Sequence, residues 1–158
     1  MASLFDSTRN FSLYTIPAAW VVALAPHVYA AQLFEARSSK AFDATAPRSF
    51  TTKVQQDPAL DAATKGRIIR AEGAQQNGFE NLGLFAAAVA AGNAAGLDHW
   101  WLNALSGAYV MSRIAYTLIY VNNETKGLAQ VRSVMFLSGV GVVWTLFIMA
   151  GNKLRSTI

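Results

Sequence analysis

Four long apolar segments alternate with polar connections along the chain. They cover roughly residues 11–35, 67–96, 99–121 and 132–151. The run from Phe11 to Phe34 contains no Asp, Glu, Lys or Arg, and the same holds from Ser133 to Asn152. Each run is long enough for the roughly 20 residues that a helix needs to cross the hydrocarbon core of a bilayer. The pattern therefore predicts an all-α integral membrane protein, a four-helix bundle formed by a single domain of residues 1–158.

Polar side chains interrupt the second apolar segment at helical spacing. Arg70 and Asn77 are seven residues apart, so they project within about 20° of each other, and Glu80 lies about 60° further round. A cation, an amide and a carboxylate on one face complement a zwitterionic ligand. Polar residues in membrane helices also serve as contacts between helices, which is the favoured interpretation of Asn77 taken alone. For the set of three, we favour a ligand site.

The third segment carries a similar stripe. Arg113, Tyr116 and Tyr120 occupy positions i, i+3 and i+7 of one helix face. Phenol groups beside a guanidinium group can bind an anion. The alternative is an ion pair between Arg113 and Glu80, with the tyrosines only packing.

Composition and charge placement support a membrane protein and suggest its orientation. Hydrophobic residues make up 53% of the chain and charged residues 14%, whereas ordinary soluble domains have about a quarter charged residues. The connection of residues 36–66 is rich in Lys and Arg, whereas residues 97–99 contain neither, so we expect the long connection in the cytosol. The net charge of +4 fits this topology and attraction to lipid headgroups rather than nucleic-acid binding.

Metal and disulfide chemistry find no support in the sequence. The chain has no cysteine, and no cluster of histidines with carboxylates suggests a metal site. His27 lies inside the first segment, where a hydrogen bond to a neighbouring helix is favoured over ligand binding. Arg132 and Ser133 open the fourth segment at the predicted cytosolic side, where topology alone accounts for a basic anchor.

Three short elements occur in order along these segments. They are Asn77-x-x-Glu80, Arg113-x-x-Tyr116-x-x-x-Tyr120 and Arg132-Ser133. With them, the chain from about residue 11 to residue 149 resembles the MAPEG family, the membrane-associated proteins of eicosanoid and glutathione metabolism. The resemblance implies a homotrimer of four-helix subunits that binds glutathione between neighbouring subunits near the cytosolic side.

The resemblance also implies a role for each polar side chain. Glu80 is expected to pair with the ammonium group of glutathione, and Arg113 to hold Glu80 or a carboxylate of the ligand. Asn77, Tyr116 and Tyr120 are expected to hydrogen-bond the peptide. The full set expected at the glutathione site is Arg70, Asn77, Glu80, Arg113, Tyr116, Tyr120 and Ser133, with Arg132 as the catalytic residue that faces the thiol.

The function implied is a glutathione-dependent transferase or peroxidase that acts on lipophilic electrophiles or lipid hydroperoxides, in the endoplasmic reticulum or another endomembrane. A guanidinium beside the sulfur favours the thiolate form of glutathione. Gly73 stands where relatives that make leukotrienes or prostaglandins have an arginine. This difference favours general detoxification over a dedicated eicosanoid synthase. It also leaves open a non-catalytic lipid-binding or scaffold protein of the same fold, and a small transporter subunit is a third, weaker alternative.

Overall fold

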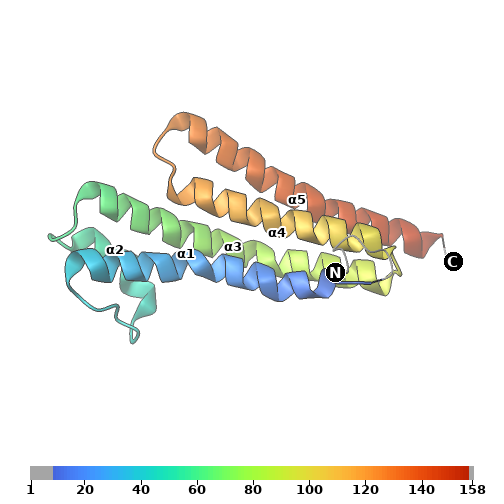
Figure 1. Ribbon diagram of the computed structural model, residues 1–158, viewed down its shortest axis with the longest axis horizontal. Helices are drawn as coiled ribbons and strands as arrows, with labels where there is room; N and C mark the ends of the chain where they lie inside the picture. The colour runs from blue at the N-terminus through green and yellow to red at the C-terminus, as the bar shows by residue number, and fades with distance from the viewer. Residues whose placement is uncertain (1–8, 157–158) are drawn as a thin grey trace.

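The protein is built almost entirely from α-helices, as the computed structural model shows for residues 9–156 (Figure 1). No strand occurs within that range. The all-α prediction is therefore confirmed. The helices are α1 (Thr15–Ser38), α2 (Phe50–Gln56), α3 (Ala62–Ala94), α4 (His99–Val121) and α5 (Lys126–Arg155), with short 3₁₀ turns at Ser12–Tyr14 and Pro47–Ser49.

The helix boundaries follow capping side chains more closely than the apolar pattern. The range predicted for α4, residues 99–121, is correct. The start predicted for α5, residue 132, is wrong, because the side chain of Thr125 accepts a hydrogen bond from the backbone N–H of Leu128 and starts the helix at residue 126. Asp61 caps α3 in the same way, so α3 also begins earlier than predicted. Arg132 consequently lies inside α5 rather than at its start.

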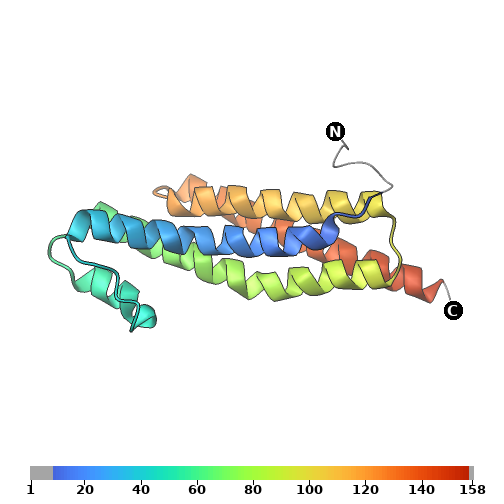
Figure 2. The same cartoon turned by 60° about the horizontal axis from the view of Figure 1, so that its bottom comes forward.

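The four long helices run lengthwise beside one another. α1 packs on α3 and α4, whereas α5 crosses α3 and α4 obliquely (Figures 1 and 2). Phe85 of α3 stacks on Tyr109 of α4 with 3.8 Å between the ring centroids, in the centre of the apolar core. Small residues let α1 and α3 approach closely, since a Cβ atom added at Gly78 would lie 2.8 Å from the Cβ atom of Ala23.

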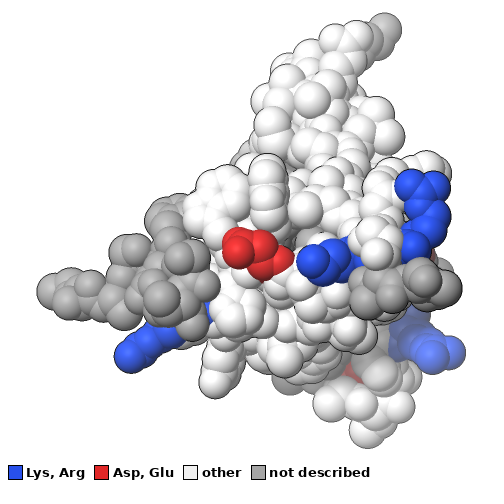
Figure 3. All heavy atoms as spheres, turned by 90° about the vertical axis from the view of Figure 1, so that its right-hand side faces the viewer, with Lys and Arg blue, Asp and Glu red and all other residues white. Residues whose placement is uncertain are grey.

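The two polar connections lie at one end of the molecule, and the described chain ends lie at the other (Figure 1). The end that carries the termini shows few acidic or basic groups among the described residues (Figure 3). Two helical segments, Ser12–Ser38 and Gly127–Arg155, are long and apolar enough to cross a membrane. The four-span topology and its orientation stay predictions.

The connection between α1 and α3 folds back onto the helices. Phe50 and Val54 of α2 are buried in a second apolar cluster with Phe34 of α1. Beside this cluster, Nδ1 of His27 lies 2.8 Å from Oε1 of Glu72, which joins α1 to α3. The expected hydrogen bond of His27 to a neighbouring helix is therefore present.

An ion pair between the exposed Lys40 and the buried Asp57 fastens this connection. Nζ of Lys40 donates to Oδ2 of Asp57 at 2.9 Å, and the Asp57 side chain is 2% exposed. The Lys40 ammonium group, and after it the backbone N–H of Ala59, hold the pKa of Asp57 below its ordinary value. The stabilisation is complete above the unfolded carboxyl pKa of about 3.9 and is lost as the pH falls through the lower folded pKa.

We therefore expect the amide protection factors of α2 to stay constant between about pH 7 and pH 5 and to decrease below about pH 4. Hydrogen exchange corrected for the intrinsic rate measures this. Asp57→Asn keeps an acceptor for Ala59 but has no charge, so its protection is expected to be lower at pH 7 and to lack the acid step. An identical acid step in Asp57→Asn contradicts the role assigned to the ion pair.

Candidate functional site

A cavity between α3, α4 and α5 gathers five of the residues predicted for the site. Its volume is about 370 Å³, within the size range of small-ligand pockets. We name it the Arg132 cavity. Its lining residues are Asn77 of α3, Tyr116 and Tyr120 of α4, and Arg132, Ser133, Phe136 and Leu137 of α5.

Helical periodicity explains how these side chains meet. Tyr116 and Tyr120 are four residues apart and therefore share one face of α4, where their rings lie edge to face at 5.5 Å. Arg132 and Phe136 have the same spacing on α5. Because α5 crosses α4, the two faces enclose the cavity together with Asn77.

Arg132 is a cation without an acidic partner in the described chain. Its guanidinium carbon lies 4.6 Å from the ring centroid of Tyr120. Among residues 9–156, no carboxylate lies within ion-pair distance of it, whereas five other basic side chains have such a partner. An unpaired guanidinium that lines a cavity has N–H donors and a charge that suit an anion.

Arg113 lies deeper and orients Asn77. Its side chain is 4% exposed, and Nη1 donates to Oδ1 of Asn77 at 3.3 Å while Nη2 donates to the backbone oxygen of Phe136 at 3.3 Å. The rings of Tyr109, Tyr116 and Phe136 surround the guanidinium carbon at 5.0 to 5.4 Å. Because Oδ1 of Asn77 is engaged, the amide N–H groups of Asn77 remain to donate to a ligand.

Besides Arg113, two of the predicted residues do not line the Arg132 cavity. Glu80 is exposed on α3, where Oε1 accepts a hydrogen bond from Gln76 at 3.2 Å. The ion pair between Arg113 and Glu80 that the sequence left open is not formed within the described chain. Arg70 is held elsewhere, since Nε donates to the backbone oxygen of Val121 at 3.0 Å and Nη2 lies 3.4 Å from Oε1 of Glu124.

Besides Leu137, which lines the Arg132 cavity, sequence reasoning missed two further residues at the site. Phe136 lines the Arg132 cavity, and Gly139 faces Arg113, since a Cβ atom added at Gly139 would collide with the guanidinium group. Their spacing was a usable signal, because Phe136 lies four residues and Gly139 seven residues after Arg132 on the same helix face.

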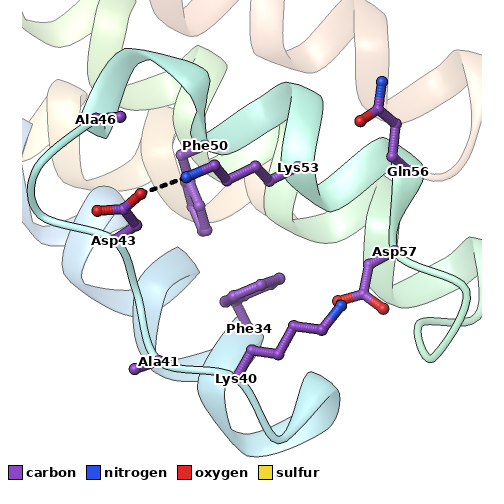
Figure 4. A pocket seen from close by; sticks show the side chains of 9 residues that line it. All are labelled: Phe34, Lys40, Ala41, Asp43, Ala46, Phe50, Lys53, Gln56 and Asp57. Carbon is purple, nitrogen blue, oxygen red and sulfur yellow. Dashed lines mark hydrogen bonds and ion pairs between the residues drawn. The ribbon is translucent and has the colours of Figure 1, made fainter.

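A second cavity, of about 360 Å³, lies in the connection between α1 and α3 (Figure 4). Lys40 and Lys53 line it together with the rings of Phe34 and Phe50 (Figure 4). The two lysines pair with Asp57 and Asp43, so their charges are compensated within the protein. This compensation distinguishes the second cavity from the Arg132 cavity, which presents an unpaired cation.

Comparison with known proteins gives one result. The family model of the MAPEG family matches residues 14–152, which is most of the chain. No curated protein and no solved structure matches significantly. The family match fits a membrane protein of glutathione-related or eicosanoid metabolism.

Proposed function

This chain belongs to the MAPEG family, and on that premise we propose that it is a membrane glutathione-dependent transferase or peroxidase. The observation that carries the proposal is the unpaired guanidinium of Arg132 in a cavity whose other polar groups are an amide and three hydroxyl groups. A cation and hydrogen-bond donors of this kind stabilise a thiolate. It is an anion that accepts hydrogen bonds and tolerates aromatic neighbours.

The chemical role of Arg132 is to favour the thiolate form of glutathione. A free thiol has a pKa near 8.5 and is only a few per cent thiolate at neutral pH. A guanidinium within hydrogen-bond distance lowers such a pKa by about 1 to 3 units. The thiolate then forms a bond to an electrophilic carbon, and the leaving group departs with the bonding electron pair. With a hydroperoxide, the thiolate attacks oxygen and releases an alcohol after protonation, and a second glutathione completes the disulfide and releases water.

The remaining contacts of the ligand extend beyond the Arg132 cavity. Asn77 offers amide donors to a carbonyl or carboxylate oxygen, and Glu80 on the outer surface of α3 offers a partner for the ammonium group. A ligand that reaches both lies partly on the exterior of the subunit. This placement supports a homotrimer in which a neighbouring subunit covers the ligand.

A lipophilic second substrate would reach the cavity from the bilayer. Phe136 and Leu137 form an apolar side of the cavity, and Leu137 is 64% exposed on the surface of α5. The neighbouring exposed side chains of α5, Val134 and Trp144, extend the same apolar surface. We place the protein in the endoplasmic reticulum or another endomembrane, in keeping with the family.

The proposal is tested by calorimetric titration of the detergent-purified protein with two peptides. We expect glutathione to bind, and an analogue with alanine in place of cysteine to bind about 10-fold more weakly, because it lacks the charge-assisted bond to Arg132. In Arg132→Ala, the two peptides are expected to bind equally. Absence of any glutathione binding to the parent protein contradicts the proposal.

One observation favours a non-catalytic lipid-binding or scaffold protein as the second candidate. Gly73 has no side chain to hold a ligand carboxylate, and Arg70 is engaged by Glu124 and Val121. One cationic contact to glutathione is therefore missing, at residue 73, and a second cation, Arg70, is occupied by other groups. The titration separates the candidates, because the scaffold requires no glutathione binding.

A further inference from the structure

Tyr120 lies between Gly73 of α3 and Arg132 of α5. Its ring faces the guanidinium group of Arg132, with 4.6 Å from the guanidinium carbon to the ring centroid. Its hydroxyl end lies over α3, so a Cβ atom added at Gly73 would stand 3.0 Å from the hydroxyl oxygen of Tyr120. The side chain of Tyr120 thus reaches from the backbone of α3 to the guanidinium group of Arg132.

The absent side chain at position 73 leaves room for this pose. Real Cβ atoms rarely approach another heavy atom to 3.0 Å, whereas the next two distances, 3.4 Å to Cζ and 3.5 Å to Cε1 of Tyr120, are ordinary contacts. Only the hydroxyl oxygen therefore conflicts with a methyl group at residue 73. The ring of Tyr120 is also fixed laterally by the edge-to-face contact with Tyr116.

Within residues 9–156, the guanidinium group of Arg132 lies over the ring of Tyr120. A guanidinium group over an aromatic face gains about 0.5 to 2 kcal/mol, depending on how far it is removed from water. This contact restricts where the guanidinium group lies, while the ring accepts no conventional hydrogen bond from it, so its N–H donors stay available to a ligand. The orientation of the donors thus depends on the position of the tyrosine ring.

We propose that Tyr120 is a positioning residue that holds Arg132 in the orientation that binds the thiolate, and that Gly73 provides the room for Tyr120 to do so. This inference rests on the proposed glutathione chemistry. Gly73 therefore has a structural role at this site, because it leaves room for Tyr120. It also has no side chain that could contact the ligand.

A double-mutant cycle tests the inference. The readout is the thiol pKa of bound glutathione, from the ultraviolet absorbance of the thiolate as a function of pH. We expect Gly73→Ala to raise this pKa by about 0.5 to 1 unit, because the displaced Tyr120 no longer supports Arg132. In the Tyr120→Phe background, which lacks the colliding oxygen, Gly73→Ala is expected to leave the pKa where Tyr120→Phe alone places it.

The matched control is Gly83→Ala. Gly83 lies on the same helix, and a Cβ atom added there meets no atom within 4 Å, so this variant carries the helix-propensity effect alone. A shift of equal size in both backgrounds, or no shift from Gly73→Ala, overturns the inference. If the parent protein shows a lowered thiol pKa that only Arg132→Ala abolishes, the proposed function stands and the positioning role fails.

A second readout needs no glutathione. Phenylglyoxal modifies arginine side chains, and mass spectrometry reports the rate at Arg132. We expect about a two- to fivefold faster modification in Gly73→Ala than in the parent, and no such increase when Tyr120→Phe is also present. Equal rates in all variants overturn the positioning role. Because this readout needs no glutathione, it tests the positioning role even if the protein binds no glutathione. Failure of the inference can thus be distinguished from failure of the proposed function.

Discussion

Replacement of Arg132 by alanine is expected to lower kcat/KM for glutathione conjugation about 10- to 100-fold at pH 7. The reason is the thiolate population. A pKa lowered by about 1 to 3 units makes thiolate a major species at neutral pH, whereas a pKa near 8.5 leaves only a few per cent. Steady-state assays with a soluble aromatic electrophile, in detergent or proteoliposomes, measure the effect. Arg132→Lys keeps the charge without the planar donors and is expected to fall between the two.

The pH dependence of the rate tests whether Arg132 acts by lowering the pKa of the thiol. In the parent protein, the rate is expected to rise through the lowered pKa and to level off near neutrality. In Arg132→Ala, it is expected to continue rising to about pH 8.5, so the difference between the proteins narrows at alkaline pH. Arg155→Ala is the matched control, because Arg155 is an exposed arginine at the far end of the same helix. A constant ratio of the two rates across this pH range contradicts thiolate activation by Arg132.

Replacement of Gly139 by alanine is expected to destabilise the protein by about 1 to 3 kcal/mol. The added Cβ atom would stand 3.1 Å from Cζ and Nε of Arg113 and closer still to Nη2. Arg113 is buried between three aromatic rings and cannot move aside without losing its bonds to Asn77 and Phe136. The change opposes the gain of about 0.5 to 1 kcal/mol that alanine ordinarily brings in a helix.

Thermal unfolding in detergent measures this second effect. Gly141→Ala is the control, since Gly141 lies two residues away on α5 and an added Cβ atom meets nothing within 4 Å. We expect Gly139→Ala to lower the melting temperature by several degrees and to weaken glutathione binding through Asn77, and Gly141→Ala to do neither. Equal melting temperatures for the two variants would show that Arg113 adapts to the added methyl group.

Helix positions and the general place of the site were accessible from the sequence. The apolar pattern predicted the range of α4, and the spacing of Tyr116 and Tyr120 predicted that both share one helix face, which lines the Arg132 cavity. These features are local, because they depend on one helix at a time. The early start of α5 was missed although its signal, Thr125 as a capping side chain, stands in the sequence.

Contacts between distant segments were not accessible in the same way. Arg70 shares a helix face with Asn77 but is drawn to Glu124 in the connection between α4 and α5, a contact that depends on how that connection folds. The room that Gly73 leaves for Tyr120 depends on the distance between α3 and α4. Periodicity predicts which face of a helix a residue occupies. It does not predict which residue of another helix packs against that face.

The central claim is that Arg132 stabilises the thiolate of bound glutathione. The most direct measurement is the ultraviolet absorbance of the thiolate when glutathione is mixed with the purified protein and titrated with acid and base. We expect a bound thiol with a pKa about 1 to 3 units below 8.5 in the parent protein, and near 8.5 in Arg132→Ala. Bound glutathione that titrates near 8.5 in both proteins would contradict this claim.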